Sequence, residues 1–400
     1  MKKVKKFLLL SVILVICCFC SSKKSGFEGN VIYYDDLVEV DAIEYGDPDY
    51  FDTCSLIVLE TNADALIADI TQLEVFEDKI YIWDASAEKL MYFSDKGNFL
   101  GTIGKKGRAP HEYGALAGFY MNAWDSTVNL FDPVNMAVKT YGIDGSYIKE
   151  VKHKNEDLGF VVKCSMLDST KIFCYHSTNW KNNNMFSVID IHDYDHSLEV
   201  VEYPYTSSEY FSSVFSNQPY VVAEGQVTYN KLFSNNLYRR KQGQTELCLE
   251  IRHKKEIDDR LLGLRLEERK GDYYKVRQDL IRENIYNTGF LNLFENNRFL
   301  LADFMTDKSR VKALLWDKKL LKGVRIDNYS NFAPDLKLFK SIHHNTVFAV
   351  WDRNSIAAFR ENLNEKNRKS YPSEMIEAVC NFNMEEDNPM LIVFTFKDEV

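Results

Sequence analysis

KIYIWDASAEKLMYFSDKGNFL at residues 79–100 decides the fold, because its pattern returns 48 positions later as TVNLFDPVNMAVKTYGIDGSYI at residues 127–148. Each stretch has an alternating apolar strand closed by Asp, a polar turn, a second strand ending in an aromatic residue, a glycine turn and a third strand. The matched positions include Ile80 with Val128, Asp84 with Asp132, Phe93 with Tyr141 and Gly97 with Gly145. Both stretches are therefore predicted to be antiparallel β-meanders whose glycine turns need a positive φ.

Weaker copies of the pattern follow at residues 171–193, 226–251, 298–326 and 346–359, which brings the number of meanders to six. Each meander needs neighbours to bury its two faces. Six such sheets arranged around an axis form a six-bladed β-propeller, an all-β fold. Two packed β-sandwiches are the alternative architecture, but they would not require a regular spacing with matched turns. We therefore predict one propeller over residues 31–400.

Two segments interrupt the repeats. Residues 255–285 are rich in helix formers and predict two short amphipathic helices, inserted between blades 4 and 5. This insertion either caps a blade edge or the channel mouth, or serves as a partner-docking surface. Residues 361–386 are polar and predict a short helix near Met375–Cys380. The final strand, 389–397, is expected to complete a blade with residues 31–45 or 55–60 from the other end of the chain.

The first residues of the chain predict a lipoprotein signal peptide. Four lysines precede an apolar run from Phe7 to Ile16, which is too short for a permanent spanning helix. The run ends in Val15-Ile16-Cys17-Cys18, and a small residue before Cys18 makes it the preferred site of lipid attachment over Cys17 and Cys20. Residues 1–17 are then the signal peptide and 18–30 a solvated tether. A plain secretory peptide is the alternative.

Charge and composition narrow the partners. The formal net charge is −10 and becomes −14 when the four lysines of the signal peptide are removed. An acidic body without a basic stripe argues against nucleic acid and against electrostatic docking on anionic lipid. The membrane is therefore expected as a partner only through the N-terminal lipid. The 26 Phe, 23 Tyr and 5 Trp suit strands with wide, half-buried faces.

One pair of cysteines is suggestive. A hairpin turning at residues 167–170 would place Cys164 opposite Cys174. The pair is either a disulfide or two small apolar residues buried in a strand pair. The odd number of cysteines in the body and the absence of zinc-ligand spacing exclude a disulfide framework and a zinc motif.

The loop Gly104–Tyr113, GKKGRAPHEY, is the most distinctive local feature. Its glycines let backbone N–H groups converge, and its lysines and Arg108 make it cationic, which suits an anionic ligand. The candidate ligand-binding residues are Lys105, Arg108, His111, Glu112 and Tyr113. In the alternative interpretation the loop is a connector in which Glu112 caps backbone donors and Tyr113 packs on the next blade.

These residues also carry a resemblance. The lipobox, Leu59-Glu60-Thr61, Ile80–Asp84, the loop 104–113 and Glu386–Pro389 resemble the six-bladed β-propeller lipoproteins of Bacteroidetes, which are related to NHL-type propellers. The resemblance implies a fold and an address in the bacterial cell envelope, either periplasm-facing or at the cell surface, and no catalytic residues. Ala109 stands where members often have a second glycine.

No catalytic set is readable, because the sequence lacks a Gly-x-Ser-x-Gly elbow and a metal-ligand spacing. We therefore expect a lipid-anchored module that binds an envelope protein or a glycan, rather than an enzyme. A metal-dependent hydrolase or lyase with its site in the propeller channel is one alternative, and Ca²⁺ held there by converging oxygens is the cofactor considered. An accessory or sensor protein in glycan uptake is the other.

Overall fold

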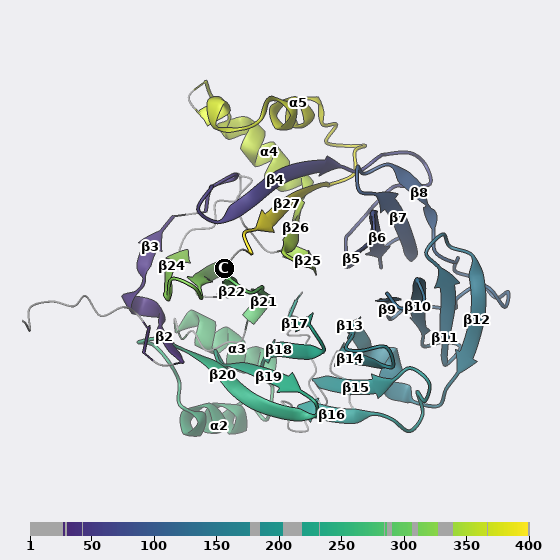
Figure 1. Cartoon of the computed structure of the whole chain (residues 1–400), viewed down its shortest axis with the longest axis horizontal. Coiled ribbons are helices and arrows are strands. Elements are labelled where there is room, and N and C mark those ends of the chain that lie inside the picture. The colour runs from purple at the N-terminus through teal and green to yellow at the C-terminus, as the bar shows by residue number, and fades with distance from the viewer. Residues whose placement is uncertain are drawn as a thin grey trace, which may run out of the picture.

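The computed structural model describes residues 27–28, 30–41, 43–176, 185–202, 218–231, 233–283, 285, 290–305, 311–326, 339–365 and 367–398. Six β-sheets stand around a central axis, and the first strands of their meanders, β5, β9, β13, β17, β21 and β25, surround the centre (Figure 1). The predicted six-bladed β-propeller is confirmed. The signal peptide 1–17 and the proposed lipid-bearing Cys18 lie outside the described residues.

The first three blades follow one another along the chain. Blade 1 contains β5 (Gln72–Phe76), β6 (Lys79–Asp84), β7 (Lys89–Ser94) and β8 (Phe99–Thr102). Blade 2 contains β9 (Gly118–Asn122), β10 (Thr127–Asp132), β11 (Ala137–Gly142) and β12 (Tyr147–Lys152). Blade 3 contains β13 (Val161–Met166), β14 (Lys171–His176), β15 (Phe186–Asp190) and β16 (Glu199–Glu202), preceded by the 3₁₀ helix η3 (Glu156–Phe160).

The last three blades also recruit the N-terminal segment. Blade 4 contains β17 (Tyr220–Ala223), β18 (Gln226–Asn230), β19 (Leu237–Lys241) and β20 (Gln244–Arg252). Blade 5 contains β21 (Phe290–Glu295), β22 (Phe299–Met305), β23 (Val311–Asp317) and β24 (Lys322–Ile326). Blade 6 contains β25 (Phe339–His343), β26 (Thr346–Trp351), β27 (Met390–Phe396) and, as its outer strand, β4 (Phe51–Val58).

The N-terminal segment runs along the outer edges of blades 4, 5 and 6. Strands β1 (Phe27–Glu28) and β2 (Val31–Tyr33) form a small hairpin, and β2 pairs in parallel with β20. After the 3₁₀ helix η2 (Tyr34–Asp36), β3 (Val38–Val40) pairs in parallel with β24, and β4 then pairs antiparallel with β27. Of the two segments predicted to complete the last blade, 55–58 does so within β4, whereas residues from 31–45 extend blades 4 and 5.

The two glycine turns lie against the preceding blade. Gly97 and Gly145 have φ values of +86° and +85°, as the repeat predicted. A Cβ on Gly97 would lie 2.2 Å from the carbonyl oxygen of Val58, and one on Gly145 would lie 2.7 Å from that of Thr102. Val58 and Thr102 belong to the outer strands of blades 6 and 1. The repeated glycine therefore allows two neighbouring blades to approach at their outer edges.

The repeated aspartates make equivalent hydrogen bonds to the backbone. Asp84 and Asp132 are fully buried. Asp84 accepts hydrogen bonds from the backbone N–H groups of Ala68, at 2.5 Å, and Ala87, at 2.9 Å. Asp132 accepts them from Gly114, at 2.9 Å, and Asn135, at 3.2 Å. Each carboxylate therefore ties the turn after its own strand to the segment that leads into the inner strand of its blade.

Helices occupy both predicted interruptions. α2 (Asp259–Glu268) and α3 (Tyr273–Arg282) lie between β20 and β21, as predicted, and α5 (Ser373–Asn381) contains the short helix expected at 375–380. The interpretation of 346–359 as a meander is wrong. Only 346–351 is a strand, and α4 (Arg353–Asn362) follows because Asp352 caps its N-terminus, accepting the Ser355 N–H at 2.7 Å. A last 3₁₀ helix, η5 (Asn367–Ser370), precedes α5.

Aromatic side chains fill the space between blades. Phe173 and Phe186 of blade 3 pack with Tyr220 and Tyr229 of blade 4 in one buried cluster. The ring centroids of Phe173 and Tyr220 are 5.0 Å apart and the rings meet edge to face.

No helix in the described part of the chain has the length and apolarity needed to cross a membrane.

Cys164 and Cys174 are direct cross-strand partners, as the hairpin prediction required. Both are buried and both are free thiols in the structure. Burial raises the pKa of the Cys164 thiol well above its usual range, with the neighbouring Cys174 adding to the shift. The pair therefore lies in an apolar layer between blades 2 and 3, where burial disfavours the charged form of the Cys164 thiol.

Candidate functional site

The loop 104–113 connects β8 of blade 1 to β9 of blade 2. Its two limbs are joined by a bridge between Lys106 and Tyr113, in which the Tyr113 N–H donates to the Lys105 carbonyl at 3.0 Å. Gly104 opens the loop at a φ of +64°, and a Cβ there would lie 2.7 Å from the Tyr141 hydroxyl. The first glycine of the motif is thus needed for both its backbone angle and the space it leaves.

Glu112 folds back over its own loop. Its Oε2 accepts a hydrogen bond from the Ala109 N–H at 2.9 Å, and a Cβ on Gly107 would lie only 1.8 Å from the same oxygen. The backbone hydrogen bond from Ala109 lowers the pKa of Glu112, with a further contribution from the Arg108 N–H. Ala109 itself is not among the residues with positive φ, so alanine fits this position without strain. Glu112 therefore caps the loop, which is the connector interpretation.

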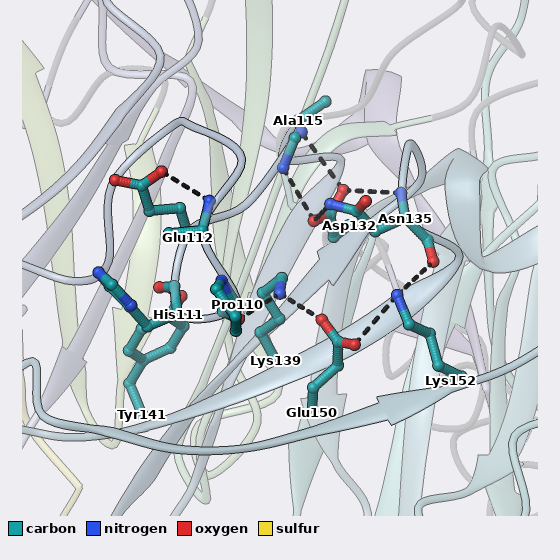
Figure 2. A network of polar contacts seen from close by, with 12 residues as sticks. Pro110, His111, Glu112, Ala115, Asp132, Asn135, Lys139, Tyr141, Glu150 and Lys152 are labelled. Atoms are coloured by element: carbon teal, nitrogen blue, oxygen red, sulfur yellow. Dashed lines mark hydrogen bonds and ion pairs between the residues drawn. The ribbon is translucent and has the colours of Figure 1, made fainter.

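Blade 2 holds the loop down from the other side (Figure 2). The buried Lys139 donates from Nζ to the Pro110 carbonyl at 2.9 Å and also pairs with Glu150. The Tyr141 hydroxyl donates to the His111 carbonyl at 2.8 Å. These contacts use the backbone of the loop, so its side chains at Arg108 and His111 remain exposed. The loop is therefore a rigid platform rather than a lid.

Tyr113 is buried between blades 1 and 2. Only 1% of its surface is exposed, and its hydroxyl donates to the Glu88 carbonyl at 2.9 Å. Its ring belongs to a cluster that includes Tyr81 of blade 1 and Phe119 of blade 2. Burial raises the pKa of Tyr113 to about 12. Tyr113 therefore positions the loop.

A pocket of about 490 Å³ opens beside this loop. The walls include Asp64, Lys89, Phe99, Lys105 and Lys106, with Tyr113 at the base. We call this cavity the blade 1 pocket. Of the predicted residues, Lys105 and Tyr113 line it, whereas Arg108, His111 and Glu112 do not. Lys89 and Phe99 were missed, because they lie on strands rather than in the motif.

The blade 1 pocket carries local positive charge. Lys106 forms an ion pair with Glu88, and this carboxylate balances the charge of Lys106. Lys89 and Lys105 form no ion pair within the described part of the chain. Asp64 is the other acidic group in the lining, and it is exposed. Two lysines without a bound carboxylate therefore face a cavity on a protein whose net charge is −10.

The helical insertion divides into a packed and an exposed helix. α3 buries Val276 and Leu280 against the core between blades 3 and 4. α2 has no buried residue, and its Leu261 and Leu264 are 43% and 47% exposed. Arg265 of α2 forms a two-pronged ion pair with Glu283, at 2.7 and 2.6 Å. Helix α3 therefore caps the core between blades 3 and 4, whereas α2 lies on the outside of the insertion.

The central axis brings together side chains from several inner strands. Lys163 Nζ on β13 lies 3.1 Å from Glu74 Oε1 on β5. The Ser165 hydroxyl of β13 is 3.1 Å from that of Tyr220 on β17. No group of three or more His, Cys, Asp or Glu side chains gathers into a metal-binding set among the residues that the structure describes.

The fold and its sites define a six-bladed β-propeller with a rigid inter-blade loop and a cationic pocket beside it. The chain belongs to the family described as a domain of unknown function, DUF4934, whose sequence profile matches residues 32–395. No curated protein matches the sequence significantly.

Two solved structures from Bacteroides share the fold. An exported protein of Bacteroides fragilis is 18% identical, with a TM-score of 0.67 over 92% of this chain and 100% of that chain. A member of the DUF4221 family from Bacteroides vulgatus is 9% identical, with a TM-score of 0.51 over 87% of this chain and 97% of that chain. At these identities the likeness concerns the fold.

Proposed function

We propose that the protein is a lipid-anchored binding module of the bacterial cell envelope that takes an anionic glycan in the blade 1 pocket. The observation that carries the proposal is the pair of lysines, Lys89 and Lys105, that face this cavity without a carboxylate partner in the described chain. Because charged hydrogen bonds are the strong ones, an acidic group of the ligand is the natural partner of these lysines.

The chemistry of the cavity favours a uronic acid. The partly exposed ring of Phe99 offers an apolar face on which a sugar ring packs, and Gly101 and Gly104 leave backbone accessible beside it. The platform is rigid, since Glu112 and Lys139 fix the loop from both sides. Rigid placement lowers the entropy cost of binding, because little chain has to be ordered. An accessory role in glycan uptake is consistent with this ligand class.

The extracytoplasmic address rests on the signal peptide and is supported by the exported protein from Bacteroides fragilis that shares the fold. Metabolic labelling with a radioactive fatty acid in a bacterial host tests the anchor. We expect label in the wild type and in Cys20→Ser, and none in Cys18→Ser. An unlabelled wild-type chain would contradict the anchor, and loss of label in Cys20→Ser alone would move it to Cys20.

Calorimetric titration of the purified chain in detergent tests the ligand, with trigalacturonate as the probe and maltotriose as the neutral control. Removing one charged contact with Lys105→Gln is expected to weaken trigalacturonate binding about tenfold or more. Lys149→Gln is the matched control, because Lys149 is an exposed lysine of β12 away from the pocket. Equal binding of both sugars, or equal losses in both variants, would refute the proposal.

A further inference from the structure

Two neighbouring leucines are exposed at a turn on the outer edge of blade 5. Leu320 and Leu321 connect β23 to β24, and each is 51% exposed. Val38 on β3, the outermost strand of the same blade, is 67% exposed. It pairs with Val324, three residues after Leu321. We call these three exposed side chains, Val38, Leu320 and Leu321, the blade 5 edge patch.

The turn itself does not require the two leucines. Asp317 accepts a hydrogen bond from the Leu320 N–H at 2.9 Å, and Leu321 follows with a φ of +48°. The turns at 85–88 and 133–136 have the same form, with an N–H donated to the preceding aspartate and a positive φ at the last residue. At the positions of the two leucines they have Ala-Glu and Asn-Met. Polar residues therefore fit both positions, and bulky residues are disfavoured at a positive φ.

Two lysines flank the leucines. Lys319 and Lys322 are exposed and form no ion pair within the described part of the chain. Acidic side chains of the N-terminal segment lie on the same side of the ring, but Asp36 and Glu39 each form an ion pair with a lysine or an arginine. Exposed leucines between lysines suit the boundary between lipid headgroups and acyl chains, where apolar groups insert and cations meet anionic headgroups.

The N-terminal end of the described chain approaches the same side of the ring. β2 pairs with blade 4 and β3 with blade 5, and both strands lie at the left of Figure 1, beside β24. The first strand begins at Phe27, nine residues after Cys18, the residue expected to carry the lipid. Nine residues span at most about 30 Å. A lipid on Cys18 therefore keeps the outer edge of blades 4 and 5 close to the bilayer.

The blade 1 pocket lies on the other side of the ring. Blades 1 and 2 are opposite blades 4 and 5 in the ring of six, and β8 and β12 lie at the right of Figure 1. The pocket is lined by the loop that joins blades 1 and 2. Contact with a bilayer at the edge of blade 5 therefore leaves the pocket open to solvent.

We propose that the blade 5 edge patch rests on the bilayer that carries the protein's own lipid. Leu320 and Leu321 insert at the headgroup boundary, and Lys319 and Lys322 lie beside anionic headgroups. The inference rests on the lipid anchor of the proposed function and does not depend on the glycan ligand. It adds a second membrane contact to the lipid, so that the ring stands on its edge with the blade 1 pocket directed away from the membrane.

Tryptophan quenching measures this contact in the full lipidated chain, reconstituted in vesicles of equimolar brominated phosphatidylcholine and phosphatidylglycerol. Leu320→Trp is expected to add a blue-shifted emission that is lost to brominated lipid, and the wild type corrects for the five native tryptophans. Val134→Trp is the matched control, because Val134 is 67% exposed in the equivalent turn of blade 2. Equal quenching of the two variants, or quenching of neither, would overturn the proposal.

Acetylation of lysines, read by mass spectrometry, tests the contact with native side chains nearby. On vesicles, Lys319 and Lys322 should be labelled severalfold less in the wild type than in Leu320→Ser/Leu321→Asn, whereas the exposed Lys149 of blade 2 should be labelled equally in both. Asparagine tolerates a positive φ, so the thermal midpoint of the double variant should not fall. Equal labelling of Lys319 and Lys322 in both proteins would contradict the inference.

Flotation with the vesicles separates this inference from the anchor. A wild-type chain that does not float would refute the anchor and this inference together. A chain that floats but shows neither quenching nor protection would refute this inference alone. Protection that grows with the density of protein on the vesicle would identify a second copy of the chain as the occupant of the patch, and would also overturn the proposal.

Discussion

Replacing Gly97 by alanine tests how the ring closes. Gly97 has a φ of +86° and its missing Cβ would lie 2.2 Å from the Val58 carbonyl oxygen, in the N-terminal strand that completes blade 6. Two costs are therefore combined at this position. One is the left-handed backbone angle, and the other is the displacement of the outer strand of the neighbouring blade.

Gly46 and Gly145 separate these two costs. Gly46 has a φ of +78° with nothing within 4 Å of its absent Cβ, so Gly46→Ala carries the backbone cost alone, about 1 kcal/mol. Gly145 has a φ of +85° and a contact of 2.7 Å with the Thr102 carbonyl, so its alanine variant adds a moderate clash. Gly97→Ala adds the most severe one, for about 2–4 kcal/mol in all.

Urea and thermal unfolding of the three variants measure the series. The expected order of destabilisation is Gly97→Ala, then Gly145→Ala, then Gly46→Ala. At an unfolding entropy of about 2 cal/mol/K per residue, each kcal/mol lowers Tm by about 1–2 °C in a chain of this length. Equal losses at Gly46 and Gly97 would refute the reasoning, because they would mean that the close approach of blades 6 and 1 costs nothing to disturb.

Three further predictions concern buried ionisable groups. Burial lowers the pKa of His176 to about 4, so between about pH 6.5 and pH 4 the unfolded chain binds a proton that the folded chain does not. The free energy of unfolding should therefore fall by up to about 3 kcal/mol as the pH drops from about 6.5 to about 4. In acid-unfolding curves His176→Gln should reduce this loss. Burial raises the pKa of Asp303 to about 7. The protonated carboxyl therefore stabilises the folded protein fully below about pH 4, and this contribution is lost as the pH rises through 7. Asp303→Asn should therefore raise the unfolding free energy at pH 8 by about 3–4 kcal/mol and leave it unchanged at pH 4; equal effects at both values would contradict the assignment. Asp132→Asn keeps the size but loses the charge of a four-way acceptor and should cost about 1–3 kcal/mol in urea unfolding, as should Asp84→Asn, whereas the exposed Asp95→Asn should be neutral.

The architecture was predictable because the residues that build it recur at fixed spacing. Asp84 and Asp132 occupy matched positions and make matched hydrogen bonds, and Gly97 and Gly145 share their backbone angle. A spacing that preserves turns and strand ends together is hard to satisfy in any fold other than one of repeated meanders. The two predicted helices of the insertion follow similarly from local pattern, since their apolar spacing and Asp caps are adjacent in sequence.

The misinterpretation of 346–359 has a physical cause. Asp352 follows an apolar strand, as Asp84 closes its own strand in blade 1, so both resemble a turn signal. At Asp352 the carboxylate instead caps α4, whose Ile356 and Phe359 bury in the core of blade 6 beside α5. The strand that should have followed comes from residues 390–396, after the two helices. A six-residue apolar run cannot distinguish these outcomes without its tertiary neighbours.

The candidate sites likewise contain some residues that the sequence could identify and others that only the fold brings together. The loop 104–113 was visible because its glycines and charges are contiguous, but the structure turns Glu112 and Tyr113 inward and leaves Lys105 at the cavity. Lys89 joins it because the hairpin returns β7 to the loop. Glu74 and Lys163 lie 89 positions apart and meet only through the closed ring. Convergence of this kind depends on topology, which no local pattern encodes.

Net charge and local charge act over different distances in this protein. The overall charge of −10 is spread over the surface, and at physiological salt it is screened within about 8 Å. Lys89 and Lys105 at the blade 1 pocket can therefore attract an acidic group although the protein as a whole repels one. An acidic body with a cationic recess thus favours an anion by contact rather than by long-range steering, as the proposed binding of an acidic glycan requires.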